Sequence, residues 1–191
     1  MLKQLWEQYT VNGNERAFSS LFTLIASDLH SYGVSLGYNS DDVNDAIQDV
    51  FINLHCNKKT NIKGDTIKFY LLRSVKNRLI DMDRMRKPVS ELSNNMVDFS
   101  LQLSIEDEYI DREHIHLVKE QVSEILNQLT AHQKEIVYLR YIEGLEYDQI
   151  ADILNLNVQN IRGQVFKALQ KLRKLSPQEQ TSILILALFI R

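Results

Sequence analysis

Apolar residues recur at helical spacing through most of the chain, and no stretch shows the strict alternation that is typical of β-strands. The spacing predicts helices over residues 3–11, 14–36, 41–55, 66–86, 106–129 and 131–142. The most regular apolar stripe comprises Val43, Ala46, Ile47, Val50, Phe51 and Leu54. Only six glycines and two prolines interrupt the 191 residues. These features predict an all-α protein.

Residues 144–172 contain two more helical patterns, separated by a short polar break. The first has an apolar face of Tyr147, Ile150, Ala151 and Leu154. The second has an apolar stripe of Val158, Ile161, Val165, Ala168, Leu169 and Leu172. Between them, Asn155 can take left-handed backbone and Asn157 can cap a new helix. The arrangement predicts a helix-turn-helix, whose second helix can enter a DNA major groove. An ordinary helical hairpin with a solvated face is the alternative. We expect a core beneath the helix-turn-helix that includes Ile136, Val137, Leu139 and Tyr141, and we expect Asn14 and Thr130 to cap the helices that follow them.

The outer face of that second helix is rich in hydrogen-bond donors. It comprises Gln159, Asn160, Arg162, Gly163, Gln164, Lys167 and Lys171. Residues 158–175 include five basic residues and no acid. Because a solvated face usually mixes charges of both signs, this segment favours a contact with phosphates.

A second basic segment lies at residues 58–87, with ten basic and three acidic residues in a chain whose net charge is −3. It spans most of a polar loop, residues 56–65, and a helix that interleaves aromatic and basic side chains. Single-stranded nucleic acid suits this combination, because phosphates pair with cations and unstacked bases lie on aromatic rings. An aromatic core with solvated basic side chains is the alternative. Two separate basic segments favour a polyanion that is contacted at two places.

The polar face of the helix at residues 41–55 is acidic. It presents Asp42, Asp45, Gln48, Asp49 and Ile52. By itself this pattern is typical of a solvated face.

The chain is expected to form two small helical domains, residues 1–87 and 106–175, joined by a flexible linker at residues 88–105. Pro88 ends the preceding helix, and the helical pattern is lost after it. Residues 176–191 form an apolar tail that includes eight consecutive apolar residues at 183–190. A membrane-spanning helix needs about 20. We expect this tail to pack on a domain, with docking to a partner or a latch between the domains as alternatives.

Other classes of chemistry find little support in the residues. Cys56 is the only cysteine, which excludes an intramolecular disulfide, predicts a half-buried thiol and favours the reducing cytoplasm. The five histidines are scattered, and no glycine-rich phosphate loop, nucleophile elbow or catalytic carboxylate pair is present. We therefore expect no enzymatic activity, metal, cofactor or small-molecule substrate.

Three segments together resemble one protein family. The run LTAHQKEIVYLRYIEGLEYDQIADILNLNVQNIRGQVFKALQKLRK resembles the fourth conserved region of extracytoplasmic-function sigma factors, the small promoter-specificity subunits of bacterial RNA polymerase. DDVNDAIQDVFINL resembles the acidic core-binding helix of that family, and FYLLRSVKNRLIDMDRMRK resembles its promoter-melting helix. The segments occur in the family's order and cover most of residues 15–175.

The resemblance implies a role for each polar surface. The polymerase-binding set would be Asp42, Asp45, Gln48, Asp49 and Ile52, in contact with the clamp helices of the β′ subunit. The set that binds the promoter −10 element would be Asn57, Lys58, Lys59, Asn61, Lys63, Arg73, Lys76, Asn77 and Arg78. The donor-rich face at residues 159–171 would read the −35 element, and the surrounding surface would meet the polymerase β flap. The resemblance also implies regulation by an anti-sigma factor.

Four positions depart from the family pattern. Asn155 stands where glycine is usual, Gln164 and Leu169 stand where arginine is common, and His55 replaces a usual tryptophan. Fewer cations imply a weaker salt dependence, or different bases read, at the −35 element. A stand-alone helix-turn-helix regulator is the alternative function, but it would not need an acidic polymerase-binding face.

Overall fold

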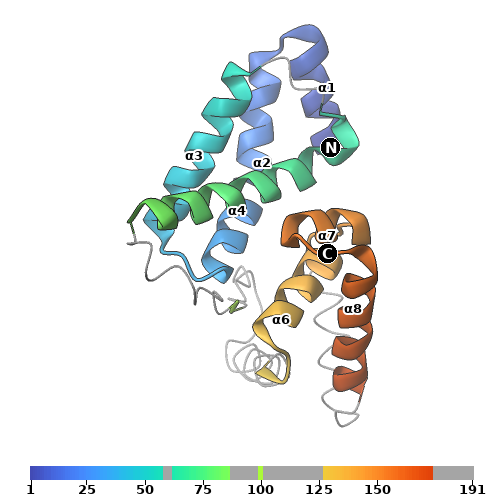
Figure 1. Cartoon of the computed structure of the whole chain (residues 1–191). Helices are drawn as coiled ribbons and strands as arrows, with labels where there is room; N and C mark the ends of the chain where they lie inside the picture. Colours follow the sequence, from blue (N-terminus) through green and yellow to red (C-terminus); the bar gives the residue numbers. More distant parts are fainter. Residues whose placement is uncertain (58–61, 87–98, 101–126, 174–191) are drawn as a thin grey trace, which may run out of the picture. The chain divides into compact units, whose positions relative to one another are not determined.

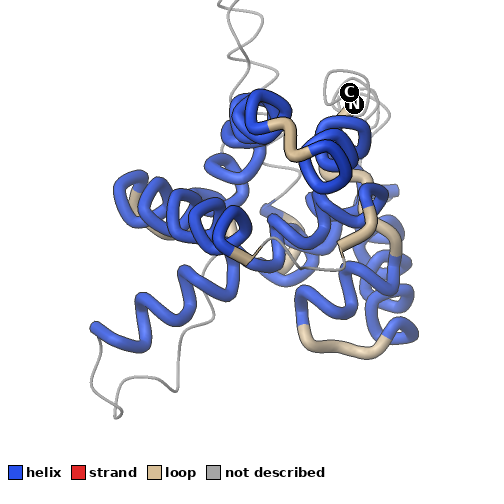
Figure 2. Tube along the Cα trace, turned by 90° about the horizontal axis from the view of Figure 1, so that it is seen from above, coloured by secondary structure: helices blue, strands red, loops and turns tan. Residues whose placement is uncertain are grey.

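A computed structural model describes residues 1–57, 62–86, 99–100 and 127–173, and all the regular secondary structure in these ranges is helical (Figures 1 and 2). The chain divides into two compact units, Met1–Val97 and Asp98–Arg191. The expectation of an all-α protein with two helical domains is confirmed. Most of the expected linker, the helix expected over residues 106–129 except its last residues, and the apolar tail lie outside the described residues.

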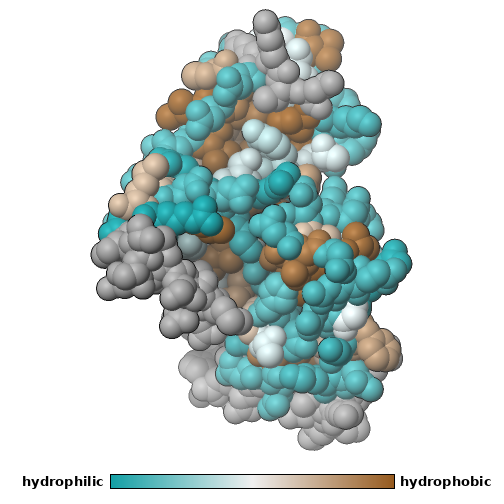
Figure 3. Space-filling view, in the orientation of Figure 1, coloured by the Kyte–Doolittle hydropathy of each residue, from teal (hydrophilic) through white to brown (hydrophobic). Residues whose placement is uncertain are grey.

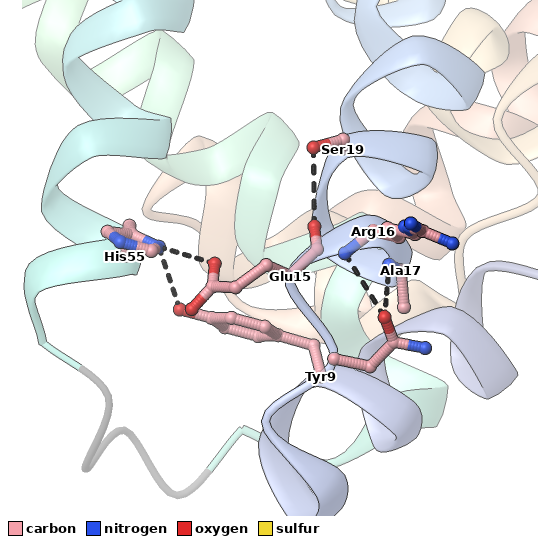
Figure 4. A network of polar contacts seen from close by, with 7 residues as sticks. Tyr9, Glu15, Arg16, Ala17, Ser19 and His55 are labelled. Carbon is pink, nitrogen blue, oxygen red and sulfur yellow. Dashed lines mark hydrogen bonds and ion pairs between the residues drawn. The ribbon is translucent and has the colours of Figure 1, made fainter.

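In its described residues the first unit contains four α-helices, α1 (Leu2–Asn12), α2 (Glu15–Ser35), α3 (Ser40–Cys56) and α4 (Ile67–Arg86), and the 3₁₀ turn η1 (Gly64–Thr66). The connection between α1 and α2 is set by Gly13, whose φ of 65° is left-handed, and by Asn14. The Asn14 side chain accepts hydrogen bonds from the backbone N–H groups of Arg16 at 3.1 Å and Ala17 at 3.3 Å (Figure 4). These bonds satisfy N–H groups that the start of a helix otherwise leaves without an acceptor.

α2 packs against α1, α3 and α4, and α4 also contacts α3 (Figure 1). The side chains at the centre of the first unit are essentially inaccessible to solvent. They include Leu21, Ile25, Leu29, Val43, Leu54, Leu71, Val75 and Leu79. Each such burial stabilises the fold by about 1.5–3 kcal/mol. Trp6 closes one end of this core, and its indole N–H donates to the carbonyl of Ile62 at 2.8 Å.

The contact of α2 with Val43 of α3 depends on Gly33. A Cβ atom at this position would lie 2.6 Å from one methyl of the fully buried Val43. Because the β-branched valine is held in one rotamer, Gly33→Ala should destabilise the first unit by about 1–3 kcal/mol. Thermal unfolding measures the loss, and Gly33→Ala with Val43→Ala should recover part of it. Additive losses in the double variant would contradict the proposed clash.

The second unit contains α6 (Ala131–Val137), the π-helical turn η3 (Tyr138–Ile142), α7 (Tyr147–Leu154) and α8 (Val158–Arg173). The predicted cap at Thr130 is confirmed, because Thr130 and Gln133 form a reciprocal capping box. The core comprises Leu129, Ile136, Leu139, Leu145, Ile150, Ile153, Ile161, Val165, Ala168 and Leu172. Phe99, inside the expected linker, is also buried here, and its ring lies 5.6 Å from that of Tyr138.

The π-helical turn corrects one predicted core position. We expected Ile136, Val137, Leu139 and Tyr141 to pack beneath the helix-turn-helix, but Tyr141 is 52% exposed. Glu143 donates its backbone N–H to the carbonyl of Tyr138, five residues earlier, at 3.1 Å. A π turn holds more residues than an α turn, so positions within it rotate away from the face that regular α-helical spacing predicts.

Candidate functional site

The helix-turn-helix prediction is confirmed by the backbone between α7 and α8. Asn155 ends α7 in left-handed conformation, with φ 52° and ψ 44°. The backbone N–H of Leu156 then donates to the carbonyl of Ala151 at 2.9 Å. Asn157 begins α8, because its side-chain oxygen accepts the N–H of Asn160 at 2.7 Å. Asparagine therefore supplies both the left-handed residue and the cap.

α8 buries one side and exposes the other. Ile161, Val165, Ala168 and Leu172 face the core. The predicted residues Gln159, Asn160, Arg162, Gly163 and Lys167 are all exposed. Hydrophilic side chains dominate the visible surface over α8 (Figure 3). Phe166 is 64% exposed on this polar side and was missed by the sequence prediction. The sequence does contain a signal for Phe166, because it is an apolar residue that lies outside the apolar stripe of this helix.

Two of the predicted DNA-binding residues on α8 form side-chain hydrogen bonds within the unit. Gln164 accepts a hydrogen bond from the side chain of Gln133 at 3.2 Å. The ammonium of Lys171 donates to the carbonyl of Gln128 at 3.2 Å. Both side chains are therefore oriented by their own fold.

A pair of arginines fixes how α7 begins. The Arg140 guanidinium lies over the Tyr147 ring, 4.6 Å from its centroid, and Arg162 lies 5.7 Å from the same centroid. Arg140 also donates to the carbonyl of Leu145 at 2.7 Å and lies 3.0 Å from the Glu146 carboxylate. Cation–π contacts of this kind contribute about 0.5–1 kcal/mol at exposed positions. Tyr147 thus connects η3 and α7 to Arg162 on the outer side of α8.

On α3 the acidic face divides into an exposed part and a part that forms ion pairs with α4. Asp45 and Gln48 are exposed, and Ile52 is 59% exposed. Ile52 lies one turn beyond Gln48 and two turns beyond Asp45, so the three share a side of α3. This side of α3 therefore combines an acid, an amide and an exposed apolar side chain. We refer to Asp45, Gln48 and Ile52 as the α3 outer face.

Asp42 and Asp49 instead connect α3 to α4. Asp49 pairs with Arg78, whose Nε and Nη2 atoms lie 2.8 and 2.7 Å from one carboxylate oxygen. Asp42 pairs with Arg86 at 2.6 Å and also accepts from Asn39 at 2.7 Å. The Asp49–Arg78 pair therefore joins a residue that is expected to bind polymerase to a residue that is expected to bind DNA.

The Asp42–Arg86 pair predicts a pH dependence of stability. The hydrogen bond from Arg86 lowers the pKa of the Asp42 carboxyl below its ordinary 3.8, with a further contribution from Asn39 and opposition from burial. The contribution of this carboxylate to stability is therefore present above the ordinary pKa and lost as pH falls through the lowered one.

The melting temperature of Asp42→Asn should consequently lie below that of the wild type at pH 7, and the difference should shrink as the pH falls below 3.8 in a pH 7 to 2 titration. Asp41→Asn is the matched control, because Asp41 is exposed in the same first turn of α3. A difference that is constant with pH would contradict the assignment.

The residues expected to bind the −10 element are only partly brought together. Asn57, Lys63 and Asn77 are exposed, and Arg73 and Lys76 are half-buried. Arg73 and Asn77 lie one turn apart on α4, and Arg78 faces Asp49. Lys58, Lys59 and Asn61 lie outside the described residues.

His55, which stands where tryptophan is usual in the resembled family, makes polar contacts here (Figure 4). Its Nδ1 atom lies 3.0 Å from the Tyr9 hydroxyl and 3.7 Å from the Glu15 carboxylate. The His55 ring stacks on Tyr9, with ring centroids 6.0 Å apart. Histidine therefore connects the end of α3 to α1 and α2. The adjacent Cys56 is exposed, so the prediction of a half-buried thiol was wrong.

Within the described ranges, no group of three or more histidine, cysteine, aspartate or glutamate side chains is arranged to hold a metal ion. None of the helices in the same ranges is both long and apolar enough to span a membrane.

Comparison with known proteins finds a family model that matches part of the second unit. The family model Sigma-70, region 4 matches residues 119–172, which include α6, α7 and most of α8. RNA polymerase sigma factor SigV of Bacillus subtilis is 25% identical over 146 residues, 76% of this chain and 82% of SigV. RNA polymerase sigma factor CnrH of Cupriavidus metallidurans is 25% identical over 169 residues, 86% of this chain and 88% of CnrH.

Two solved structures are similar across both units. One is CnrH in complex with the cytosolic domain of CnrY, with a TM-score of 0.54, 23% identity, and coverage of 89% of this chain and 93% of that chain. The other is the sigma factor RpoE of Bartonella quintana in complex with the anti-sigma factor NepR, with a TM-score of 0.55, 22% identity, and coverage of 82% and 94%. Likeness at this identity supports the fold.

Proposed function

We infer that this chain belongs to the extracytoplasmic-function sigma factors of bacterial RNA polymerase: it binds the core enzyme and directs promoter-specific initiation of transcription. Like its relatives it is a sigma factor, and the polymerase supplies the chemistry of RNA synthesis. We place it in the cytoplasm, where that polymerase acts.

The observation that carries this proposal is the α3 outer face in a chain that also has a helix-turn-helix. The opposite side of α3 is buried, with Val43 and Ala46 fully inaccessible, so the helix does not need Ile52 for its own packing. A stand-alone regulator requires the DNA-reading helix but no such second surface. We propose that Asp45, Gln48 and Ile52 contact the β′ clamp helices directly, and that Asp42 and Asp49 support them by fixing α3 on α4.

We propose that the first unit binds the −10 element and the second unit binds the −35 element. Arg73, Asn77 and the loop that begins at Asn57 would hold the opened single strand, where cations meet phosphates. The exposed N-terminal part of α8 would enter the major groove, as second helices of this motif do. Phe166 joins the predicted residues there, because an exposed apolar ring can contact a thymine methyl group. The β flap would meet the surface around these helices.

The partner of RpoE in its solved structure is an anti-sigma factor. We extend this mode of regulation to the present chain, because both share the fold. The experiment below tests promoter recognition and does not identify this partner.

Transcription in vitro tests the proposed function. Core polymerase with this chain should start transcripts at a defined subset of positions on genomic DNA, and core polymerase alone should not. Sequencing the 5′ ends should then reveal two common upstream elements. A chain that binds duplex DNA specifically but neither binds core polymerase nor changes the start sites would be a stand-alone regulator.

A further inference from the structure

Gln133 is a buried amide that connects the start of α6 to α8. Only 5% of its surface is exposed. Its side-chain oxygen accepts the backbone N–H of Thr130 at 3.3 Å, and its own backbone N–H donates to the Thr130 hydroxyl at 3.2 Å. Its side-chain nitrogen donates to the side-chain oxygen of Gln164 at 3.2 Å. Gln133 therefore uses both ends of its amide.

The direction of these bonds follows from chemistry. A backbone N–H can only donate, so the end of the Gln133 amide beside Thr130 must be the oxygen. The end beside Gln164 must then be the NH₂ group, which can only donate. Consequently Gln164 must turn its oxygen towards Gln133, and its own NH₂ group is left for another partner. The backbone of one helix start thus fixes the orientation of a side chain on α8.

Gln164 lies at the edge of the exposed, polar side of α8. Gln164 is half-buried, and it lies one turn from each of Asn160 and Lys167, which are exposed. An adenine contact by glutamine requires one donor and one acceptor from the same amide. The oxygen of Gln164 is held against Gln133, so the NH₂ group is the end of the amide that remains to meet another partner, and an NH₂ group only donates.

We propose that Gln133 is a positioning residue that makes Gln164 a donor-only contact to DNA, which takes an acceptor atom, either a phosphate oxygen or the N7 or O6 of guanine. The inference rests on the proposed function of α8. It explains how a neutral residue can serve where the family commonly has arginine, because the fixed amide presents donors without a charge.

Matched variants of the full-length chain, assembled with core polymerase, test this role. The probe is a duplex enriched by the wild-type holoenzyme from a pool randomised at the upstream element. Gln164→Ala should weaken binding roughly tenfold through loss of one hydrogen bond. Gln164→Glu should weaken it further, because it still accepts from Gln133 but presents an oxygen to the DNA.

Gln133→Glu separates positioning from folding. Glutamate is the usual partner in a capping box, so the bond from Thr130 and the start of α6 are retained. Its second oxygen, however, requires a donor from Gln164, which reverses that amide and presents its oxygen outward. Gln133→Glu should weaken binding to the duplex roughly tenfold in the wild-type background. In a Gln164→Ala background the same substitution should weaken binding by less than about twofold.

Thr130→Ala is the structural control. It removes the hydroxyl of the cap but leaves the backbone N–H that orients Gln133, so it should lower the melting temperature without changing DNA affinity. If Gln133→Glu binds as the wild type does, or its loss is undiminished in the Gln164→Ala background, the positioning role is wrong.

The nature of the acceptor is resolved on the same duplex. A phosphate is identified if one neutral methylphosphonate substitution abolishes the difference between wild type and Gln164→Ala. A guanine is identified if the wild type selects it and Gln164→Ala does not. An adenine preference that is lost in Gln164→Ala would overturn the proposal. A wild-type holoenzyme that enriches no duplex would instead overturn the proposed function, and the inference with it.

Discussion

Asp45→Lys in the full-length chain should reduce its affinity for core polymerase by roughly a hundredfold or more. Asp45 is exposed on the α3 outer face, so the change leaves the core of the first unit intact. A lysine there would face groups that are complementary to an acid, and juxtaposed like charges at an interface cost several kcal/mol. Fluorescence anisotropy of the labelled chain titrated with core polymerase measures the loss.

Two further variants sharpen this experiment. Ile52→Asp should have a comparable effect, because it removes an apolar contact and places a charge in its position. Glu7→Lys is the matched control, since Glu7 is exposed on α1 and the change in net charge is the same as in Asp45→Lys. Equal losses in Asp45→Lys and Glu7→Lys would indicate a general effect of charge and would contradict a specific α3 outer face.

Asp49 is a less suitable residue for this purpose, although the sequence pattern gives it the same weight as Asp45. In Asp49→Lys the new ammonium would lie beside Arg78, which now pairs with Asp49 at 2.7 Å. Loss of polymerase binding could then follow from displacement of α4. The unfolding temperature of each variant should therefore be measured together with its affinity.

The helices and the helix-turn-helix were predictable because their determinants are local. The apolar stripe at residues 43–54, the capping asparagines and the left-handed Asn155 act within a few residues of themselves, and each was confirmed. Tyr141 was placed wrongly because a π turn depends on the tertiary packing of η3, and the spacing of apolar residues does not reveal it.

The sequence could not predict which polar residues of α3 and α8 are paired within the fold, because these contacts are not local. Asp42, Asp45 and Asp49 have the same chemistry and lie on the same helix. Asp45 interacts with Arg86 of α4 through its charge alone, whereas Asp49 and Asp42 form ion pairs with arginines of α4 at 2.7 and 2.6 Å. Those contacts join residues 29 and 44 positions apart in the sequence. Likewise, helical spacing places Gln164 beside other polar residues, whereas its bond to Gln133 depends on how α6 packs on α8.

Gly163 should show opposite effects on stability and on DNA binding. It lies within α8, exposed, and a Cβ atom there would meet nothing within 4 Å. Glycine inside a helix costs about 0.5–1 kcal/mol relative to alanine. No contact in the described part of the second unit explains why glycine stands at this position. Close approach of the α8 backbone to DNA would explain it.

Gly163→Ala should accordingly raise the melting temperature of the second unit by several degrees, since about 1 kcal/mol shifts a domain of this size by roughly 4–8 °C. The same variant should weaken binding of the holoenzyme to the selected upstream duplex. Gly163→Glu should abolish that binding, because it adds both bulk and a negative charge opposite phosphates.

Gln170→Glu provides the control for charge. Gln170 is exposed two turns beyond Gly163 on the same side of α8, towards the C-terminal end, whereas the N-terminal residues of such a helix contact the bases. It should therefore weaken binding much less than Gly163→Glu does. If Gly163→Ala stabilises the unit and leaves DNA affinity unchanged, the DNA does not approach α8 at Gly163, and the surface that reads the upstream element must lie elsewhere on the second unit.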